Sequence, residues 1–350
     1  MEQAELQPAS PDSTFVKTFP CTGCGAKLSF APGTRELKCE FCGKANDIAE
    51  DDSRVEELDF DTYLLALEGQ MEVEDAEEVK CEKCGAQQRL AANLFASHCT
   101  FCGTAVVSKS YASRRIKPKS MVPFQLDRPR AQEAFRQWLR WRLLAPGDLR
   151  RYARSDATLT GVYLPFWTYD CRTSTDYTGS RGVKRDKSTS WTSVAGHIDK
   201  FHDDVVVLAS RSLPESLQGA ITSWDTKALV PYQPEFVSGF EAEAYQIGLK
   251  DGYQVARSTI DGQVRYLIRR DIGGDDQRID SVHTQYSDVT FKHVLLPVWI
   301  SAYRYRDRVY RFVVNAQSGE TTGESPLSWW KVALLVLVGL VLFYFWLTSQ

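Results

Sequence analysis

The chain has 350 residues, with 42 Lys and Arg against 45 Asp and Glu, a formal net charge of −3 and a mean hydropathy of −0.32. At about 150 residues per domain, this length allows two or three domains. The mild acidity excludes a protein that coats nucleic acid through its net charge. The low hydropathy excludes a membrane protein with many spans.

The first predicted elements are two cysteine modules that share one pattern, in which two CxxCG motifs are separated by 14 residues. Four thiolates at this spacing complete a tetrahedral shell around Zn²⁺, and the glycine after each pair permits the tight turn below the sulfurs. A closed shell of four sulfurs leaves no position for a substrate, so we predict two structural zinc ions. We call the two modules ribbon one and ribbon two. The predicted ligands are Cys21, Cys24, Cys39 and Cys42 in ribbon one, and Cys81, Cys84, Cys99 and Cys102 in ribbon two.

Three other uses of these cysteines remain open. Disulfides require an oxidising compartment, and the first ten residues lack the basic and apolar regions of a secretory signal. A thioredoxin-like site needs one CxxC in a βαβ unit rather than four motifs in duplicate. Iron in a rubredoxin-like site uses the same ligands as zinc. His98, next to Cys99, is a fallback ligand that four sulfurs make unnecessary.

Charge is segregated along the chain. Residues 46–80 hold 14 acidic groups against Arg54 and Lys80, a net of −12, whereas residues 109–154 hold 13 basic groups against three acidic ones, a net of +10. These are either two solvated surfaces, or an acidic linker that shields the basic segment from an anionic partner such as phospholipid or nucleic acid. We expect this linker to separate ribbon one from the following domain, so that Cys21→Ser unfolds ribbon one alone.

The central part of the chain predicts an α+β domain built on a mainly antiparallel sheet. Asp127 and Pro129 mark the start of a helix whose apolar residues recur at helical spacing as far as Leu143. Strands are expected at 173–179, 190–197 and 205–209, and residues 241–270 are expected to be mainly helical. Two Leu-Pro-x-Trp motifs, at 164–167 and 296–299, should each begin or edge a strand, because proline donates no ladder hydrogen bond.

A hairpin is expected over residues 303–314, with its turn at Arg306 and Asp307. Cys171 is the one cysteine outside the ribbons, and the nearest candidates for a catalytic dyad with it are His197, His202, Asp203 and Asp204. No nucleophile elbow or oxyanion loop accompanies it, so an inert buried thiol is the simpler interpretation.

The C-terminal segment is the most apolar part of the chain. Residues 329–347 give about 28 Å of helix, close to the thickness of a hydrocarbon core of about 30 Å. Trp329 and Trp330 suit one membrane interface, while Tyr344 and Trp346 suit the other. Positive charge precedes this span and none follows it. The positive-inside rule therefore predicts a single-pass protein of the inner (cytoplasmic) membrane, with the bulk of the chain in the cytoplasm.

The cysteines and residues 296–324 carry a resemblance over nearly the whole chain. The paired ribbons look like TFIIB-type or rubredoxin-like zinc ribbons, and the whole arrangement resembles a family of bacterial double zinc-ribbon, tail-anchored membrane proteins. Members of that family are often labelled primosomal proteins or replication helicase-like. The chain has no phosphate-binding GxxxxGK[ST] loop, so we do not carry a helicase activity over. The resemblance implies partners such as an SPFH/band-7 scaffold or a membrane-stress protein.

Taken together, the sequence predicts a multidomain chain. The predicted units are ribbon one (15–46), an acidic and partly helical linker (47–79), ribbon two (80–108), the α+β domain (109–326) and a transmembrane helix (329–347). The expected function is a non-enzymatic adaptor that presents protein-interaction surfaces at the cytoplasmic face of the membrane. Two alternatives are a membrane-tethered nucleic-acid-binding protein and a membrane-associated enzyme that uses Cys171. Residues 21–45 carry a net charge of only +2, which does not favour the nucleic-acid alternative.

Overall fold

The computed structural model describes most of the chain outside its N-terminus and parts of ribbon two. The described residues are 19–26, 28–51, 53–67, 73–80, 85–89, 96–98, 105–107, 111–149, 159–186, 188–218, 221, 223–306 and 308–348.

Three long strands dominate the main sheet: β11 (Thr160–Arg185), β12 (Ser188–Leu208) and β15 (Asp276–Tyr305). β11 pairs antiparallel with both of the others, and β15 continues through a hairpin into β16 (Arg308–Asn315). The sheet also includes β4 (Leu58–Asp59), β10 (Ser120–Met121), β13 (Val230–Pro231), β14 (Glu241–Ala242) and β17 (Thr321–Gly323). The predicted α+β fold with a mainly antiparallel sheet is confirmed.

The remaining elements are short strands and helices around this sheet. The short strands are β1 (Leu28–Phe30), β2 (Glu36–Cys39), β3 (Ala45–Asp47), β5 (Val73–Lys80), β6 (Gln87–Arg89), β7 (Ala96–His98), β8 (Ala105–Val107) and β9 (Tyr111–Ile116). The helices are α1 (Phe60–Leu67), α2 (Arg128–Arg140), α4 (Glu215–Gln218), η1 (Thr226–Ala228), α5 (Pro234–Val237), α6 (Leu249–Ile272) and α7 (Trp329–Thr348). The predicted helix over 241–270 thus divides into strand β14 and helix α6.

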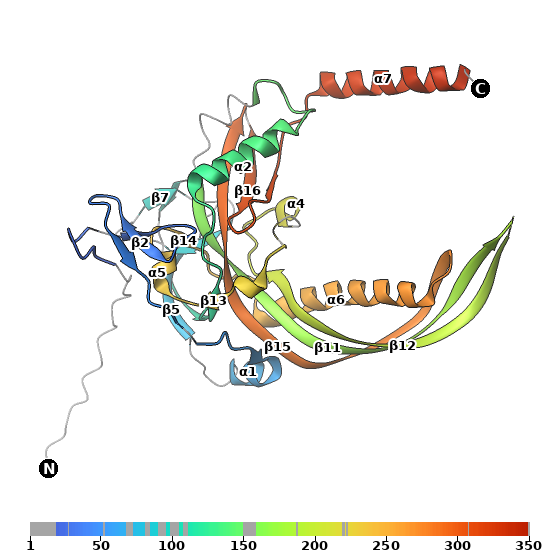
Figure 1. Cartoon of the computed structure of the whole chain (residues 1–350), viewed down its shortest axis with the longest axis horizontal. Coiled ribbons are helices and arrows are strands. Elements are labelled where there is room, and N and C mark those ends of the chain that lie inside the picture. The colour runs from blue at the N-terminus through green and yellow to red at the C-terminus, as the bar shows by residue number, and fades with distance from the viewer. Residues whose placement is uncertain are drawn as a thin grey trace, which may run out of the picture.

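The outer parts of the long strands form a curved arm, which comprises residues 172–200 and 276–290. Figure 1 shows the arm sweeping away from the rest of the domain, called the body below, with α6 on its concave side. Along the outer part of β11, buried and more exposed residues alternate, as expected for a sheet covered on one face only. Inside the body, both faces of β11 and β15 are covered, and eleven consecutive residues of each are buried. The unbroken buried runs here and the alternation in the arm reflect these two environments.

The two Leu-Pro-x-Trp motifs lie directly opposite each other at the centre of the sheet, with Leu164 paired to Leu296. Their prolines do not begin or edge a strand, so that prediction is wrong. Pro165 lies where β14 stops pairing with β11 and β12 begins. Pro297 lies where β10 stops pairing with β15 and β16 begins. A missing backbone N–H costs no ladder bond at such a gap, which explains how proline fits inside a central strand.

The surroundings of the two motifs repeat as well. β14 pairs in parallel with Val162 and Tyr163, and β10 pairs in parallel with Val294 and Leu295, at the same offsets before each motif. Each of these short strands is followed by a helix, α6 and α2 respectively. α6 packs on β11 and β12, and α2 packs on β16 and β17. This shared order and register supports an internal duplication, in which each helix packs on strands of the other copy.

The helix α2 follows its sequence signals closely at its start. The Asp127 side chain caps it by accepting the amide of Arg130 at 3.0 Å, and proline occupies the first turn. The helix ends at Arg140, earlier than predicted, and Trp141 and Leu143 fall in the following loop. Phe135 stacks on Phe312 of β16, so the apolar face of α2 is core.

The acidic segment after ribbon one is attached to the body. β4 pairs with Thr290 and Phe291 of β15, and helix α1 brings Phe60 and Tyr63 against the ring of Phe291. Further along, β5 pairs with β9 at the start of the basic segment. The acidic and basic segments therefore meet in a small sheet with β6.

One helix among the described residues is long and apolar enough to cross a membrane. α7 spans Trp329–Thr348 with a mean hydropathy of 2.2 in its most apolar window, and none of that window is buried. Figure 1 shows it projecting from one end of the body without covering any other element. Its first turn is held by the Lys331 ammonium, which donates to the carbonyls of Leu143 at 3.1 Å and Ala145 at 2.7 Å.

Candidate metal centre

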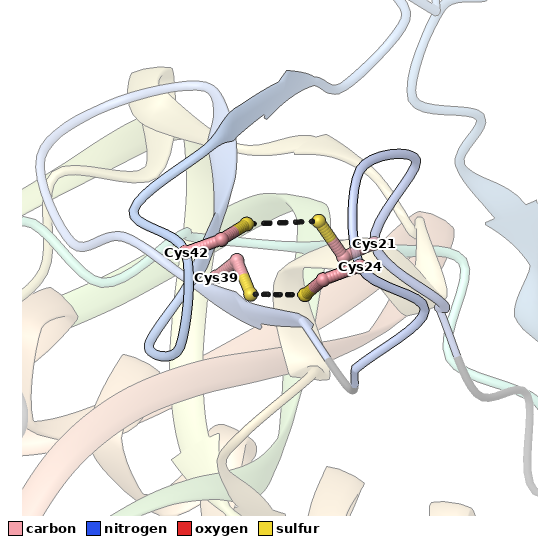
Figure 2. A group of neighbouring side chains, drawn as sticks. All are labelled: Cys21, Cys24, Cys39 and Cys42. Atoms are coloured by element: carbon pink, nitrogen blue, oxygen red, sulfur yellow. Dashed lines mark hydrogen bonds between the residues drawn. The ribbon is translucent and has the colours of Figure 1, made fainter.

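Two tight turns bring the four cysteines of ribbon one together. Cys21 and Cys24 lie on the turn before β1, while Cys39 ends β2 and Cys42 lies on the turn between β2 and β3. Figure 2 shows the four side chains pointing at one another. The Sγ atoms of Cys21 and Cys42 are 3.5 Å apart, as are those of Cys24 and Cys39, and all four lie within 4.8 Å of one another.

These separations fit a metal ion rather than disulfides. A disulfide bond holds its sulfurs about 2.05 Å apart. Four sulfurs at about 2.3 Å from a tetrahedral Zn²⁺ lie about 3.8 Å from one another. The four cysteines can therefore hold one metal ion and are compatible with zinc, without rearrangement of the backbone.

The glycines after each pair do what the motif predicts. Gly25 and Gly43 have φ angles of 74° and 73°, a region that side chains other than glycine rarely adopt. In this conformation the Gly25 amide donates to the Cys21 carbonyl at 2.9 Å, and the Gly43 amide donates to the Cys39 carbonyl at 3.0 Å. The chain thereby turns back beneath the sulfurs.

Backbone amides prepare part of the cluster for ionisation. The amides of Cys24 and Gly23 lower the pKa of Cys21 to about 6, and those of Cys42 and Phe41 lower the pKa of Cys39. Although the Lys44 amide acts in the same direction at Cys42, the three neighbouring sulfurs raise the pKa of Cys42 to about 12. Four thiolates therefore need a compensating cation, which a divalent metal supplies.

Ribbon one is part of the main hydrophobic core. Cys21, Leu28 and Cys39 are buried in the same cluster as Tyr163 and Trp299 of the sheet. The expectation that this ribbon is separate from the body is therefore wrong. The reason is its non-local packing, because β1 lies against the segment around α5.

Specific contacts make this attachment. The ring of Phe30 packs edge-on against Phe236 at 5.1 Å between centroids, and the Phe30 amide donates to the Ser238 carbonyl at 2.9 Å. The Ser238 hydroxyl donates to the Leu28 carbonyl at 2.6 Å. Gly239, with a φ of 89°, lies so close to Ser29 that a side chain there would clash.

The second predicted ligand set lies outside the described residues. Cys81, Cys84, Cys99 and Cys102 are all in this category. The described parts of ribbon two, apart from the backbone of Lys80 at the end of β5, are Gly85, with a φ of 75°, Ala86, which is buried in a core cluster with Val162, and the backbone of β6 and of the paired strands β7 and β8. The glycine conformation matches that of Gly25 after the first CxxC of ribbon one.

Cys171 has the surroundings of an inert thiol. It is fully buried at the base of the arm, in the same core cluster as the buried face of α6, and burial raises its pKa to about 11. The nearest histidine across the strand, His202, uses one ring nitrogen on Thr173 at 3.1 Å and the other on Gln263 at 3.0 Å. Neither nitrogen is left to take a proton from the thiol, so the candidate dyad of the enzymatic alternative is not formed between Cys171 and His202.

His197 lies on the open face of the arm in a Ser-His-Asp arrangement. Its Nδ1 is 2.7 Å from Asp176, and its Nε2 is 3.3 Å from the Ser174 hydroxyl. A second carboxylate, Asp199, lies 3.0 Å from the same Nε2. Asp176 and Asp199 raise the pKa of His197. Because both ring nitrogens contact carboxylates, Asp199 competes with the Ser174 hydroxyl for Nε2, and the arrangement is that of an exposed ion-pair cluster.

A buried ionic cluster was missed in the sequence. The Lys292 ammonium lies 2.7 Å from Asp204, 3.0 Å from Glu57 and 3.4 Å from Asp170. These residues come from β15, β12, the segment before β4 and β11. The one sequence signal for this cluster was Lys292, which stands beside the apolar run of β15. Its three partners are dispersed over the chain, so no spacing indicated them.

Electrostatics in this cluster favour a structural role. Burial raises the pKa of Asp170 to about 6, although the Asp204 amide and Lys292 oppose this shift. Burial alone would lower the pKa of Lys292, but its carboxylate partners raise that pKa well above its usual value. Asp170, Asp203 and Asp204 are close enough to hold a cation. The Lys292 ammonium already provides positive charge at Asp170 and Asp204.

The turn from Cys39 to Cys42, called the second knuckle below, carries an exposed aromatic ring at its tip. Phe41 lies between Cys39 and Cys42, and 83% of its surface is accessible. Ribbon two has Phe101 at the matching place in its sequence. An isolated exposed ring is common, but a ring on a knuckle that metal can hold rigid is a suitable contact for a partner.

Comparisons with known proteins give one relative to report. The chain is 26% identical over 329 residues to a Bacillus subtilis (strain 168) protein described as uncharacterized protein YdjG. The match covers 91% of this chain and 92% of the relative, so the similarity extends from the ribbons to the C-terminal region. No protein-family model and no solved structure matches the chain.

Proposed function

We propose that this protein is a membrane-anchored adaptor, in which zinc-bound ribbons present a protein-binding surface and α7 fixes the assembly in the bilayer. The observation that carries the proposal is the exposure of Phe41. It lies at the tip of the second knuckle of the four-sulfur cluster, and the base of this cluster is buried in the body. A rigid aromatic side chain gains contact area at little cost in entropy, which is how anchors of protein interfaces work.

The remaining parts of the proposal concern metal and membrane. Each ribbon holds one structural Zn²⁺, two per chain, because four thiolates fill a tetrahedral shell. α7 crosses the inner (cytoplasmic) membrane once. The basic groups before it keep the bulk of the chain on the cytoplasmic side. The partner belongs to the class that the family resemblance implies, an SPFH/band-7 scaffold or a membrane-stress protein.

The buried, high-pKa thiol of Cys171 does not favour the enzymatic alternative. The nucleic-acid alternative draws on the same ring, because an exposed Phe41 could also stack on a base. The test must therefore separate protein from nucleic acid.

The experiment compares full-length protein and Phe41→Ala in affinity capture from detergent-solubilised membranes. We expect the specific partner to be lost with Phe41→Ala and retained with Tyr266→Ala, a matched control that removes an exposed ring on α6. Metal analysis should give two zinc ions per chain in all three proteins, which shows that the ribbon itself is intact.

Two outcomes would contradict the proposal. One is capture of the same proteins by wild type and Phe41→Ala. The other is a mobility shift of duplex DNA at physiological salt that Phe41→Ala abolishes, which would favour the tethered nucleic-acid-binding protein.

A further inference from the structure

One end of the body gathers exposed basic and apolar side chains from two separate elements. The loop after α2 exposes Trp141 and Leu143, with 83% and 76% of their surfaces accessible. Beside them stand the exposed Arg140 and Arg142. Arg142 lies over the ring of Trp138, at 4.4 Å from its centroid, which orders its side chain.

The second element is the β15–β16 hairpin. Arg304, Arg306 and Arg308 are exposed around its turn. The Tyr305 hydroxyl donates to Asp148 at 2.9 Å, which ties the hairpin to the loop that follows α2. We call the five arginines, Trp141 and Leu143 the basic end face.

The basic end face lies where α7 leaves the body. The Ser328 amide donates to the Leu144 carbonyl at 2.8 Å, and Ser328 is buried, so the last residue before α7 is fixed to the loop that carries Trp141 and Leu143. Figure 1 shows the C-terminal end of α2, the tip of β16 and the start of α7 at this same end.

We propose that the basic end face lies on the surface of an anionic bilayer, with its arginines at the lipid phosphates and Trp141 and Leu143 in the interfacial layer. This inference rests on the membrane anchoring proposed above and adds how the body is held. Residues 140–148 and 304–308 hold five arginines against Asp148 and Asp307, a net charge of +3, so the face complements anionic headgroups. Tryptophan prefers the interface between water and hydrocarbon, and clustered basic residues beside a membrane span bind anionic lipid. The five arginines act together with Lys331 in the first turn of α7.

The arm limits how α7 can be inserted. In Figure 1, α7 and the arm extend from the body toward the same side. The tip of the arm carries exposed charges, including Lys184 and Arg185, which cannot enter hydrocarbon. The arm must therefore stay in water when α7 crosses the bilayer.

Hydrogen exchange of the full chain in vesicles tests the proposal. One set of vesicles contains phosphatidylcholine alone, and the other contains phosphatidylcholine with phosphatidylglycerol. We expect amides of residues 141–149 and 304–309 to exchange at least about tenfold more slowly in the anionic vesicles, and amides of the arm to be unchanged. Free glycerophosphate added to the neutral vesicles should give no protection, because the site needs a surface.

Variants separate charge from general effects. Replacing Arg304, Arg306 and Arg308 together with Gln should abolish the protection of both segments. The matched control replaces Arg265, Arg269 and Arg270, three exposed arginines of α6, with Gln and should leave it intact. A second pair of changes, Trp141→Ser with Leu143→Ser, should reduce the tryptophan fluorescence that lipids brominated near the headgroup quench, and leave only the share of the tryptophans in α7.

The outcomes distinguish this proposal from the anchoring on which it rests. Protein that alkaline carbonate extracts from the vesicles would show that α7 does not anchor the chain. Protein that stays inserted but has equal exchange in both kinds of vesicle would overturn the basic end face as a lipid surface. Protection produced by duplex DNA and not by phosphatidylglycerol would overturn it as well.

Discussion

Ribbon one and the arm are two regions that cannot build a core of their own and that solve this problem in different ways. In ribbon one, a few apolar side chains are joined to the body, and four sulfurs are positioned around a metal site. The arm relies on a single helix, because α6 buries a stripe that includes Tyr253, Ile260 and Ile268 against the concave face. Metal binding provides strong, local bonds, whereas the stripe divides its contribution among many side chains. A substitution in ribbon one should therefore have a large effect on stability that extends into the body. A substitution in the arm or in α6 should have a smaller effect that stays local.

The largest expected effect comes from Cys39→Ser. Cys39 is a buried predicted ligand, and losing it removes metal-binding free energy on the order of 10 kcal/mol from ribbon one. Because Phe30 packs on Phe236, hydrogen exchange should also accelerate around α5 and not only in residues 19–48. Metal analysis should show one zinc lost per chain, while Cys171→Ser, the control at a buried cysteine outside the cluster, should keep both. Faster hydrogen exchange confined to residues 19–48 would show that ribbon one is an independent module.

The buried ionic cluster stands between the two regions, since it joins the segment after ribbon one to the base of the arm. Lys292→Met leaves three carboxylates without their cation and should cost about 3–5 kcal/mol of unfolding free energy. The exposed Lys250→Met is the control and should change it by less than about 0.5 kcal/mol. Thermal unfolding in detergent measures both.

The pH dependence of Lys292→Met has a defined sign. In the wild-type protein, burial holds the pKa of Asp170 at about 6, above the value of about 3.9 for an unfolded chain. Removing Lys292 raises that pKa further, because an attractive charge is lost. The folded variant then binds more protons than the unfolded chain above pH 4, so its stability falls as pH rises through 6. A loss of stability that is the same at pH 5 and pH 8 would argue against this cluster.

Local features of these regions could be predicted from the sequence, and long-range ones could not. The CxxC motifs of ribbon one, the Asp127 cap and the turn at Arg306 each depend on a few consecutive residues, and the structure places all three as expected. The apolar composition of α7 likewise marked it as a helix able to span a membrane.

The features that the sequence did not predict depend on strand register and on contacts between distant segments. The prolines of the Leu-Pro-x-Trp motifs are tolerated because of where the flanking strands β10, β12, β14 and β16 begin and stop. No local pattern reports this arrangement. In the same way, Glu57 meets Lys292 across 235 positions of the chain, so the pair has no recognisable spacing.

A side-chain truncation in α6, the helix that covers the arm, tests the expectation of a smaller and local effect. Ile260 is fully buried in the middle of α6, and Ile260→Ala should cost about 2–5 kcal/mol through lost burial and the cavity that remains. Val255→Ala on the exposed side of the same helix should cost less than about 0.5 kcal/mol. Hydrogen exchange should accelerate in the arm and stay unchanged in ribbon one. Loss of zinc from Ile260→Ala would show that the two regions are coupled.

The smallest expected effect concerns the open face of the arm, where His197 lies between Asp176 and Asp199. These carboxylates raise the pKa of His197 above its unfolded value of about 6.5, so the stabilisation is complete below pH 6 and disappears as pH rises through the higher folded value. The cluster is exposed, so salt should weaken the effect. We expect the midpoint of thermal unfolding to fall slightly between pH 6 and pH 8.5 in wild type, and this part of the fall to be absent in His197→Gln. An unchanged slope in His197→Gln would mean that other groups cause the pH dependence and that the open face adds nothing to the stability of the arm.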